Sequence, residues 1–114
     1  MRRLLPFAAI LILALGLAPS TNGRVPIGTL AGIVFNVRGE PAPNAVVAIQ
    51  ASDGVQPFAT HTDSSGHFRF LRLETGQYDL RASLGRQLSE WTKRVMVHAN
   101  KTTQVTLRLS PDGP

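Results

Sequence analysis

The stretch that decides the fold runs from Thr62 to Ala82 and reads TDSSGHFRFLRLETGQYDLRA. Apolar and polar residues alternate at 67–71 and again at 77–84, which is the period of a half-buried β-strand. Each alternating run follows a turn signal, first DSSG and then LETG. The stretch therefore predicts two strands that share one core. The residues expected to fill that core are Phe68, Phe70, Leu73, Tyr78 and Leu80.

The rest of the chain after residue 28 continues this pattern of short strands. Turn signals recur about every eight to twelve residues, the spacing of an all-β sandwich or barrel. We expect seven strands, at 29–36, 45–51, 58–62, 67–71, 77–84, 91–97 and 103–109. The DSSG turn is expected to close a hairpin between the third and fourth strands. In the last two strands, Val95 and Val97 are expected to pair with Val105, Leu107 and Leu109 on one face. No helix is expected, because residues 87–94 lack a sustained 3.6-residue period. A seven-stranded, two-sheet Greek-key-type sandwich is predicted.

The N-terminus has the composition of a secretory signal peptide. Residues 1–3 read MRR, and residues 4–18 are apolar apart from one proline and one glycine. The small residues Ala18 and Ser20 suit a cleavage site, and we place cleavage after Ser20. An uncleaved membrane anchor is the alternative, although a spanning helix needs about 20 apolar residues. The predicted organisation is a signal peptide at 1–20, a linker at 21–28, a domain at 29–109 and a flexible tail at 110–114.

Composition limits the classes of function. The chain has 114 residues, of which 43% are hydrophobic, and it has no cysteine. It therefore has no disulfide framework, thiolate metal site or cysteine nucleophile. The net charge is +5, but the arginines are scattered along the chain. Scattered charges favour solvated strand faces, so nucleic acid is not an expected partner, whereas weak attraction to anionic cell-surface polymers is expected.

Three spaced motifs lie between Leu30 and Ala82 of the expected domain. They are Leu30-x-Gly32-x-Val34-x-Asn36-x-x-Gly39-x-Pro41, then Asn44-Ala45-x-Val47, then Thr62-Asp63-x-x-Gly66-x-Phe68-x-Phe70-x-x-Leu73-x-x-Gly76-x-Tyr78-x-Leu80-x-Ala82. In order and spacing they resemble the carboxypeptidase regulatory-like domain family, which usually has Asp where this chain has Asn36. The resemblance implies a transthyretin-like β-sandwich with an Ig-like architecture, related to prealbumin-like and carbohydrate-binding-like folds. It implies a regulatory domain without peptidase activity.

The residues of these motifs have structural roles. Gly32 lies in the middle of a strand, where a missing side chain indicates close approach of another chain segment. Gly39 and Gly66 are expected in turns, and Gly76 at a second reversal of the chain. The structural motif residues are Gly32, Gly39, Pro41, Asp63, Gly66, Phe68, Phe70, Gly76 and Tyr78.

Catalytic and metal chemistry have little support. His61, Asp63 and His67 form the tightest polar cluster, and two imidazoles with a carboxylate are zinc ligands. A solvent-facing turn with a structural Asp is the favoured interpretation, so no metal, cofactor or enzymatic activity is predicted. Serines lie outside any Gly-x-Ser-x-Gly motif. The C-terminus SPDGP also differs from the Tyr-Arg-Gly-Ser end of the related hydroxyisourate hydrolases.

Trp91 is the one candidate binding residue. It is the only tryptophan, and an exposed indole is a surface on which sugar rings stack. The alternative is that it packs over the end of the core. We expect a secreted, non-catalytic interaction or structural module, periplasmic or extracellular, whose partner is a protein or a cell-surface polysaccharide. The alternative function is a carbohydrate-binding module that uses Trp91 as its stacking platform.

Overall fold

The computed structural model describes residues 25–54 and 57–111, and the predicted signal peptide lies outside them. Its strands are β1 (Ile27–Phe35), β2 (Val46–Ala51), β3 (Phe58–His61), β4 (His67–Glu74), β5 (Gly76–Leu84), β6 (Gln87–Leu88), β7 (Thr92–Val97) and β8 (Thr102–Arg108). The described part contains no helix, and so none that would span a membrane. The predicted all-β class is confirmed, with one more strand than expected.

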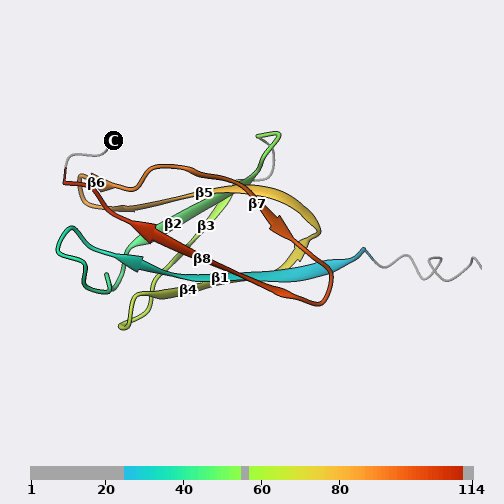
Figure 1. Cartoon of the computed structure of the whole chain (residues 1–114), viewed down its shortest axis with the longest axis horizontal. Coiled ribbons are helices and arrows are strands. Elements are labelled where there is room, and N and C mark those ends of the chain that lie inside the picture. The colour runs from blue at the N-terminus through green and yellow to red at the C-terminus, as the bar shows by residue number, and fades with distance from the viewer. Residues whose placement is uncertain (1–24, 55–56, 112–114) are drawn as a thin grey trace, which may run out of the picture.

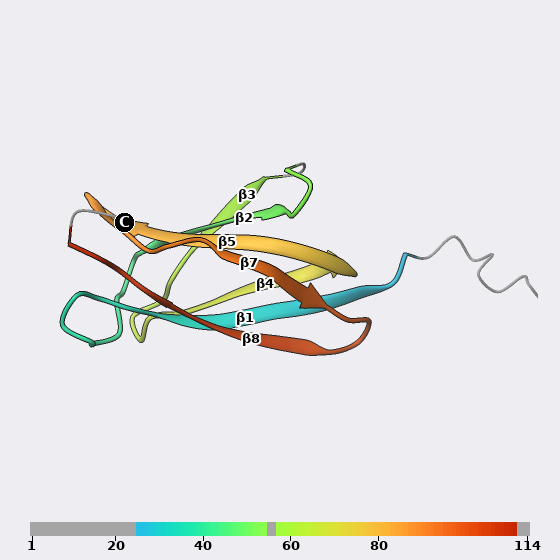
Figure 2. The ribbon, with the colours of Figure 1, turned by 45° about the horizontal axis from the view of Figure 1, so that its top comes forward.

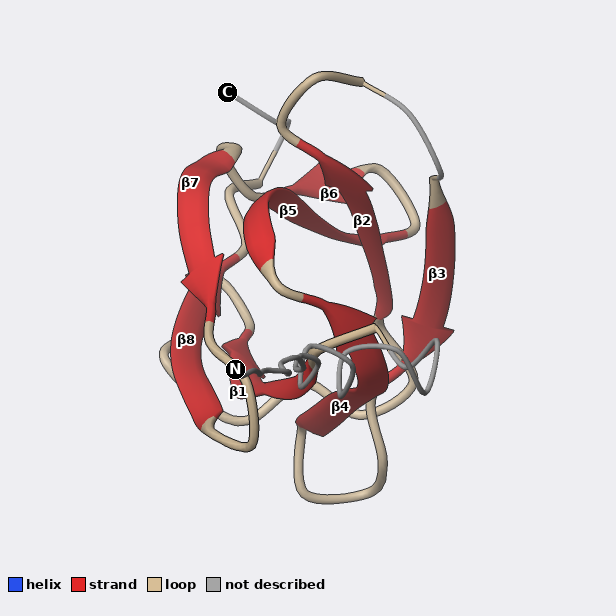
Figure 3. Ribbon diagram, turned by 90° about the vertical axis from the view of Figure 1, so that its right-hand side faces the viewer, coloured by secondary structure: helices blue, strands red, loops and turns tan. Residues whose placement is uncertain are grey.

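The strands form two facing sheets (Figures 1 and 2). Sheet A has the order β4-β1-β8, and sheet B has the order β3-β2-β5, with β6 and β7 both pairing with β5. The β1–β8 pair is parallel, and the other pairs are antiparallel. Viewed along the strands, β7 and β8 lie on one side of the sandwich and β3 on the opposite side (Figure 3).

The core lies between the two sheets because alternate residues of each strand point inward. The inward positions of β4 and β5 are apolar, and all five residues predicted for the core are buried. Leu80 of the central strand β5 is fully buried. The rings of Phe68 and Phe70 pack edge to face, with their centres 6.0 Å apart. A Cβ atom on Gly32 would overlap the carbonyl oxygen of Val105 and touch the Phe68 ring. The predicted close approach at Gly32 is therefore confirmed.

The predicted hairpin at residues 63–66 is wrong. The turn forms, but β3 pairs with β2 in sheet B while β4 pairs with β1 in sheet A. Thr62, at the end of β3, accepts from the backbone N–H of Ala45 at 2.8 Å and donates to the carbonyl oxygen of Ala42 at 2.6 Å. These bonds tie β3 to the segment before β2, so the turn carries the chain from one sheet to the other.

The last two predicted strands also belong to different sheets. Val95 and Val97 were expected beside Val105 and Leu107 on one face, but β7 pairs with β5 and β8 pairs with β1. Thr103 of β8 donates its hydroxyl to the carbonyl oxygen of Met96 at 2.7 Å, which links the two edges by a side chain. These valines and the leucine therefore contribute to one core from opposite sheets.

The structure differs from the predicted strands most at the two ends of the domain, in β4 and in the extra strand β6. β1 begins at Ile27, within the segment predicted as linker, and Ser110 of the predicted tail donates its N–H to the Leu88 carbonyl oxygen at 2.8 Å. β4 continues to Glu74, which leaves Thr75 as the whole link to β5. The extra strand β6 has two residues and is too short to produce a sequence pattern.

Candidate functional site

Trp91 lies directly before β7, at the edge of sheet B, and its side chain is half-buried. The guanidinium carbon of Arg81, on β5, lies 4.7 Å from the centre of the indole ring. This is the geometry of a cation–π contact. Ser89, two residues before Trp91, is buried. Its hydroxyl accepts a hydrogen bond from the Ala82 N–H at 2.8 Å and donates one to the Glu90 carbonyl oxygen at 2.9 Å, which holds the segment before Trp91 in place. Trp91 and Arg81 together form a small amphipathic surface.

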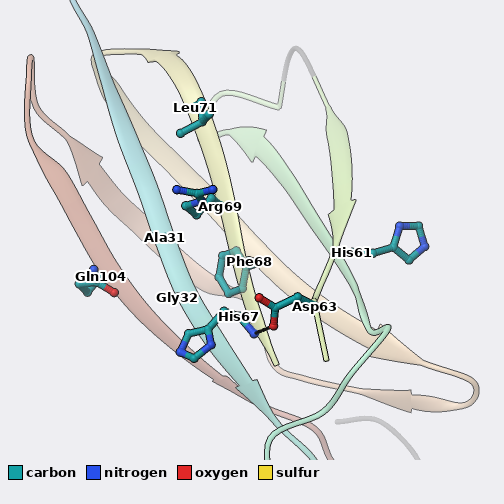
Figure 4. A pocket seen from close by; sticks show the side chains of 9 residues that line it. All are labelled: Ala31, Gly32, His61, Asp63, His67, Phe68, Arg69, Leu71 and Gln104. Atoms are coloured by element: carbon teal, nitrogen blue, oxygen red, sulfur yellow. Dashed lines mark hydrogen bonds between the residues drawn. The ribbon is translucent and has the colours of Figure 1, made fainter. Parts of the chain in front are cut away.

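An open groove of about 520 Å³ lies on the outer face of sheet A (Figure 4). Most of the lining residues are outward ones that alternate with the buried residues of β1, β4 and β8, whereas Gly32 and Phe68 are buried and His61 comes from β3. The lining residues are Ala31, Gly32, His61, Asp63, His67, Phe68, Arg69, Leu71 and Gln104. The groove therefore crosses sheet A and ends at the turn between β3 and β4.

The structure does not bring the predicted polar cluster together. His61 lies on β3 in sheet B and its ring points away from Asp63, whereas His67 begins β4 in sheet A (Figure 4). Asp63 Oδ1 accepts the backbone N–H groups of Ser65 and His67, each at 2.9 Å. The described residues contain no group of three side chains placed to hold a metal ion. Asp63 acts in the turn, as the structural interpretation predicted.

The pKa of Asp63 reflects this use of its carboxylate. The two backbone N–H groups, first that of His67 and then that of Ser65, stabilise the charged form and lower the pKa of Asp63 below its usual value. The carboxylate is ionised at neutral pH, and its main role is to hold the turn. Its charge also interacts with Arg69 and His67, which lie at the same end of the groove.

A second open cavity, of about 410 Å³, lies beside the first on the same sheet. Its lining residues are Ile27, Gly28, Thr29, Leu71, Arg72, Asn100, Lys101 and Thr102. Leu71 lines both cavities and is 59% exposed. Sequence reasoning missed this pair of grooves. The available signal was Leu71 itself, an apolar residue at an outward position of the alternating run in β4.

A bulge in β4 explains how the two grooves meet. The register between β1 and β4 shifts between Gly28 and Leu30, and Arg72 has a left-handed backbone with φ of 59°. Such an extra residue bends the strand and redirects its side chains. Leu71 and Arg72 are consequently both exposed, although they are consecutive residues of one strand.

Asp79 is one of the polar residues in the alternating run at 77–84, but its side chain is buried. The residue is 8% exposed, and its Oδ1 accepts from the Ser52 hydroxyl at 2.8 Å and the Arg94 N–H at 3.0 Å. The Arg94 backbone donor is the main cause of a lowered pKa for Asp79, and the Ser52 hydroxyl adds to it. Because the carboxylate ties the β2–β3 loop to β7, its role is structural.

Comparison with known sequences identifies the chain's relatives. Residues 29–110 match the family model of the carboxypeptidase regulatory-like domain. Over 84 residues, which is 74% of this chain, the sequence is 33% identical to halomucin of Haloquadratum walsbyi. The matched segment is 1% of halomucin, so this chain corresponds to a very small part of that protein.

Solved structures share the sandwich at lower identity. GBS52, the minor pilin of Streptococcus agalactiae, superposes with a TM-score of 0.63 at 23% identity, over 76% of this chain and 46% of the pilin. A candidate carbohydrate-binding protein from Bacteroides uniformis gives 0.59 at 14% identity, over 75% and 42%. The 5-hydroxyisourate hydrolase of Klebsiella pneumoniae gives 0.51 at 15% identity, over 80% and 91%. These likenesses show the fold, which hosts both enzymes and other proteins.

Proposed function

The chain belongs to the carboxypeptidase regulatory-like domain family, and we propose that it is an exported, non-catalytic module that binds a partner at the cell envelope or outside the cell. The proposal rests on a contrast between polar side chains that are hydrogen-bonded within the fold and two open grooves on the surface of sheet A. Asp63, Asp79 and Ser89 use their side chains to hold turns and loops, whereas the two cavities of sheet A are open grooves on a sheet face. An open face suits docking of a large partner.

Catalysis needs a different arrangement. An active site brings a nucleophile or a metal, a base and an orienting group together in a sheltered pocket. Here the two groove histidines lie on different sheets, and the carboxylate beside them is bonded to the backbone. The sandwich does not by itself exclude an enzyme. Support for a binding role comes from how these side chains are used.

Export is tested by following the full-length chain in its host. We expect the protein in the periplasm or the medium, with Thr21 as the N-terminal residue found by mass spectrometry. A matched control replaces Leu11 and Leu13 by Arg, which interrupts the apolar run and should keep the chain inside the cell. A wild-type chain recovered intact from the cytosol would contradict the proposal.

The second candidate function is carbohydrate binding at Trp91. The half-buried indole beside Arg81 favours it, because a sugar ring stacks on an aromatic face and a guanidinium bonds to its hydroxyls. Since Trp91 is the only tryptophan, its fluorescence reports this site directly. A glycan that binds here shifts the emission to shorter wavelength, and Trp91→Ala abolishes binding. Phe58→Ala removes another exposed aromatic ring and should leave binding unchanged.

A further inference from the structure

We propose that the two cavities flanking Leu71 form one binding site, the sheet A groove, for an acidic polysaccharide whose carboxylates contact the cationic side chains while its sugar rings lie over Leu71. The proposal rests on the proposed function and names the ligand class of that binding module. The site is separate from Trp91, which lies at the edge of sheet B.

Continuity is the first argument for a single site. The cavities of about 520 and 410 Å³ share Leu71, so they are two halves of one path that runs diagonally over the sheet, from the starts of β1 and β8 to the start of β4. The path begins at the Asn100–Lys101 turn and ends at the turn that holds Asp63. It crosses strands spaced about 4.8 Å apart. An open, elongated path of this kind suits a linear polymer that passes through, rather than a small molecule that is enclosed.

Charge is the second argument. Arg69, Arg72 and Lys101 line the sheet A groove. Asp63 is the one carboxylate among the lining residues, and it lies at one end of the groove. The lining therefore has an excess of positive charge. A groove of one sign attracts a polymer of the opposite sign and concentrates it locally.

The uncharged lining favours a sugar polymer. Thr29, Thr102 and Gln104 place hydroxyl and amide groups along the groove, and these groups both donate and accept hydrogen bonds, as sugar hydroxyls require. Leu71, 59% exposed, supplies an apolar ridge for the less polar face of a sugar ring. The combination of dispersed hydroxyl partners, cations and a small apolar ridge matches a carboxylated polysaccharide.

Two other acidic polymers fit less well. An extended acidic peptide pairs through its backbone with a sheet edge, which in sheet A is β4 or β8, whereas this groove is lined mainly by outward side chains on the face of the sheet. A nucleic acid needs aromatic rings on which bases stack, and Phe68, the one aromatic residue of the lining, is only 3% exposed.

The binding test uses the purified protein and three soluble polymers at low and moderate salt. Polygalacturonate presents carboxylated sugars, dextran presents neutral sugars, and poly-glutamate presents carboxylates on a peptide backbone. We expect saturable binding to polygalacturonate, about tenfold weaker binding to poly-glutamate, and weaker binding at higher salt because exposed charges are screened. Binding to dextran or poly-glutamate as tight as to polygalacturonate would overturn the ligand class.

Matched triple variants locate the site. The groove variant carries Arg69→Gln, Arg72→Gln and Lys101→Gln, and the control variant carries Arg86→Gln, Lys93→Gln and Arg94→Gln. Both remove three exposed cations, and each includes one arginine with a left-handed backbone, Arg72 or Arg94. We expect the groove variant to bind polygalacturonate about tenfold more weakly and the control variant to bind like the wild type. Circular dichroism checks that both are folded.

The outcomes separate this proposal from the proposed function. Equal losses in both variants would show attraction by net charge and overturn the sheet A groove. A Leu71→Ser variant that binds like the wild type would overturn the role of the apolar ridge. An exported protein that binds none of the three polymers would overturn the polysaccharide ligand while leaving an exported module in place. A protein that stays in the cytosol would contradict the proposed function first.

Discussion

Two turns of this sandwich have nearly the same geometry but different surroundings. In the turn at 36–40, Asn36 Oδ1 accepts the N–H groups of residues 38 and 40 at 2.8 and 3.0 Å. In the turn at 63–67, Asp63 Oδ1 accepts those of residues 65 and 67, each at 2.9 Å. Both turns place a left-handed glycine three residues after the polar one, with φ of 81° at Gly39 and 79° at Gly66.

The surroundings differ in packing and in charge. A Cβ atom on Gly39 would meet nothing within 4 Å, whereas one on Gly66 would lie 2.9 Å from the Ala42 nitrogen and 3.0 Å from the Val34 carbonyl oxygen. Asn36 is neutral and Asp63 carries a charge that its backbone partners stabilise. The same local motif is thus a surface loop at one position and a packed link between the two sheets at the other.

The largest expected effect on stability comes from replacing the glycine of each turn, Gly66 or Gly39, by alanine. Gly66→Ala combines the left-handed backbone, worth about 1–2 kcal/mol for a residue with a Cβ, with overpacking worth about 1–3 kcal/mol. We expect it to lower the free energy of unfolding by about 2–4 kcal/mol. Gly39→Ala should lower it by about 1–2 kcal/mol, since only the backbone cost applies. Urea denaturation of the two variants measures both effects.

Asparagine variants serve as the control, because Asn adopts the left-handed conformation more readily than Ala. Gly39→Asn should recover most of the stability lost in Gly39→Ala. Gly66→Asn should recover little, because its side chain meets the same backbone atoms. If the two alanine variants lost the same free energy of unfolding, the packing around Gly66 would contribute nothing to stability. The proposed difference in packing between the two turns would then be wrong.

The local part of this contrast was predictable from sequence, and the long-range part was not. The spacing Asp63-x-x-Gly66 fixes a turn because the Asp side chain bonds to nearby backbone and Gly takes a positive φ. Which strands then pair depends on contacts distant in sequence, such as those of Thr62 with Ala42 and Ala45. Those contacts send β3 and β4 to different sheets. Alternation in the sequence predicts which residues face inward, and it cannot choose between two sheets that share one core.

The candidate site shows the same limit. The sequence singles out Trp91 because its residue type is informative by itself. The sheet A groove depends on a bulge at Arg72 and on Lys101, which is distant from it in the chain. Neither feature has a local signature. Leu71, an apolar residue in an outward position, was the one visible sign of this surface.

A smaller effect, the pH dependence of folding stability, should also distinguish the two turns. The folded state lowers the pKa of Asp63, so the carboxylate contributes stability that is present above the ordinary Asp pKa of about 3.9 and is lost as pH falls through the folded-state pKa. Asp63→Asn keeps the accepting oxygen but has no proton to bind. We expect a smaller drop in the urea midpoint between about pH 5 and pH 2.5 for this variant than for the wild type.

Asp79 is expected to account for part of the acid sensitivity of stability that remains in Asp63→Asn. The pKa of Asp79 is lowered in the same direction, so its share of the stability disappears over a similar range of acid pH. Asp63→Asn should therefore reduce the drop without removing it, and Asp79→Asn should reduce it further. If Asp63→Asn had the same pH dependence of stability as the wild type, the charge of Asp63 would contribute nothing to the stability of the turn. The two turns would then differ in packing only.

The smallest effect comes from giving the first turn the charge of the second. Asn36 donates from Nδ2 to Glu40 Oε1 at 3.3 Å, so Asn36→Asp replaces this bond by two facing carboxylates on the surface. We expect a loss of about 0.5 kcal/mol at neutral pH, because exposed charge pairs interact weakly, and recovery when Glu40→Gln is added. A loss that persists in the double variant would place the cost in the turn itself. That result would mean that Asp and Asn are not equivalent acceptors here, although the two turns have the same geometry.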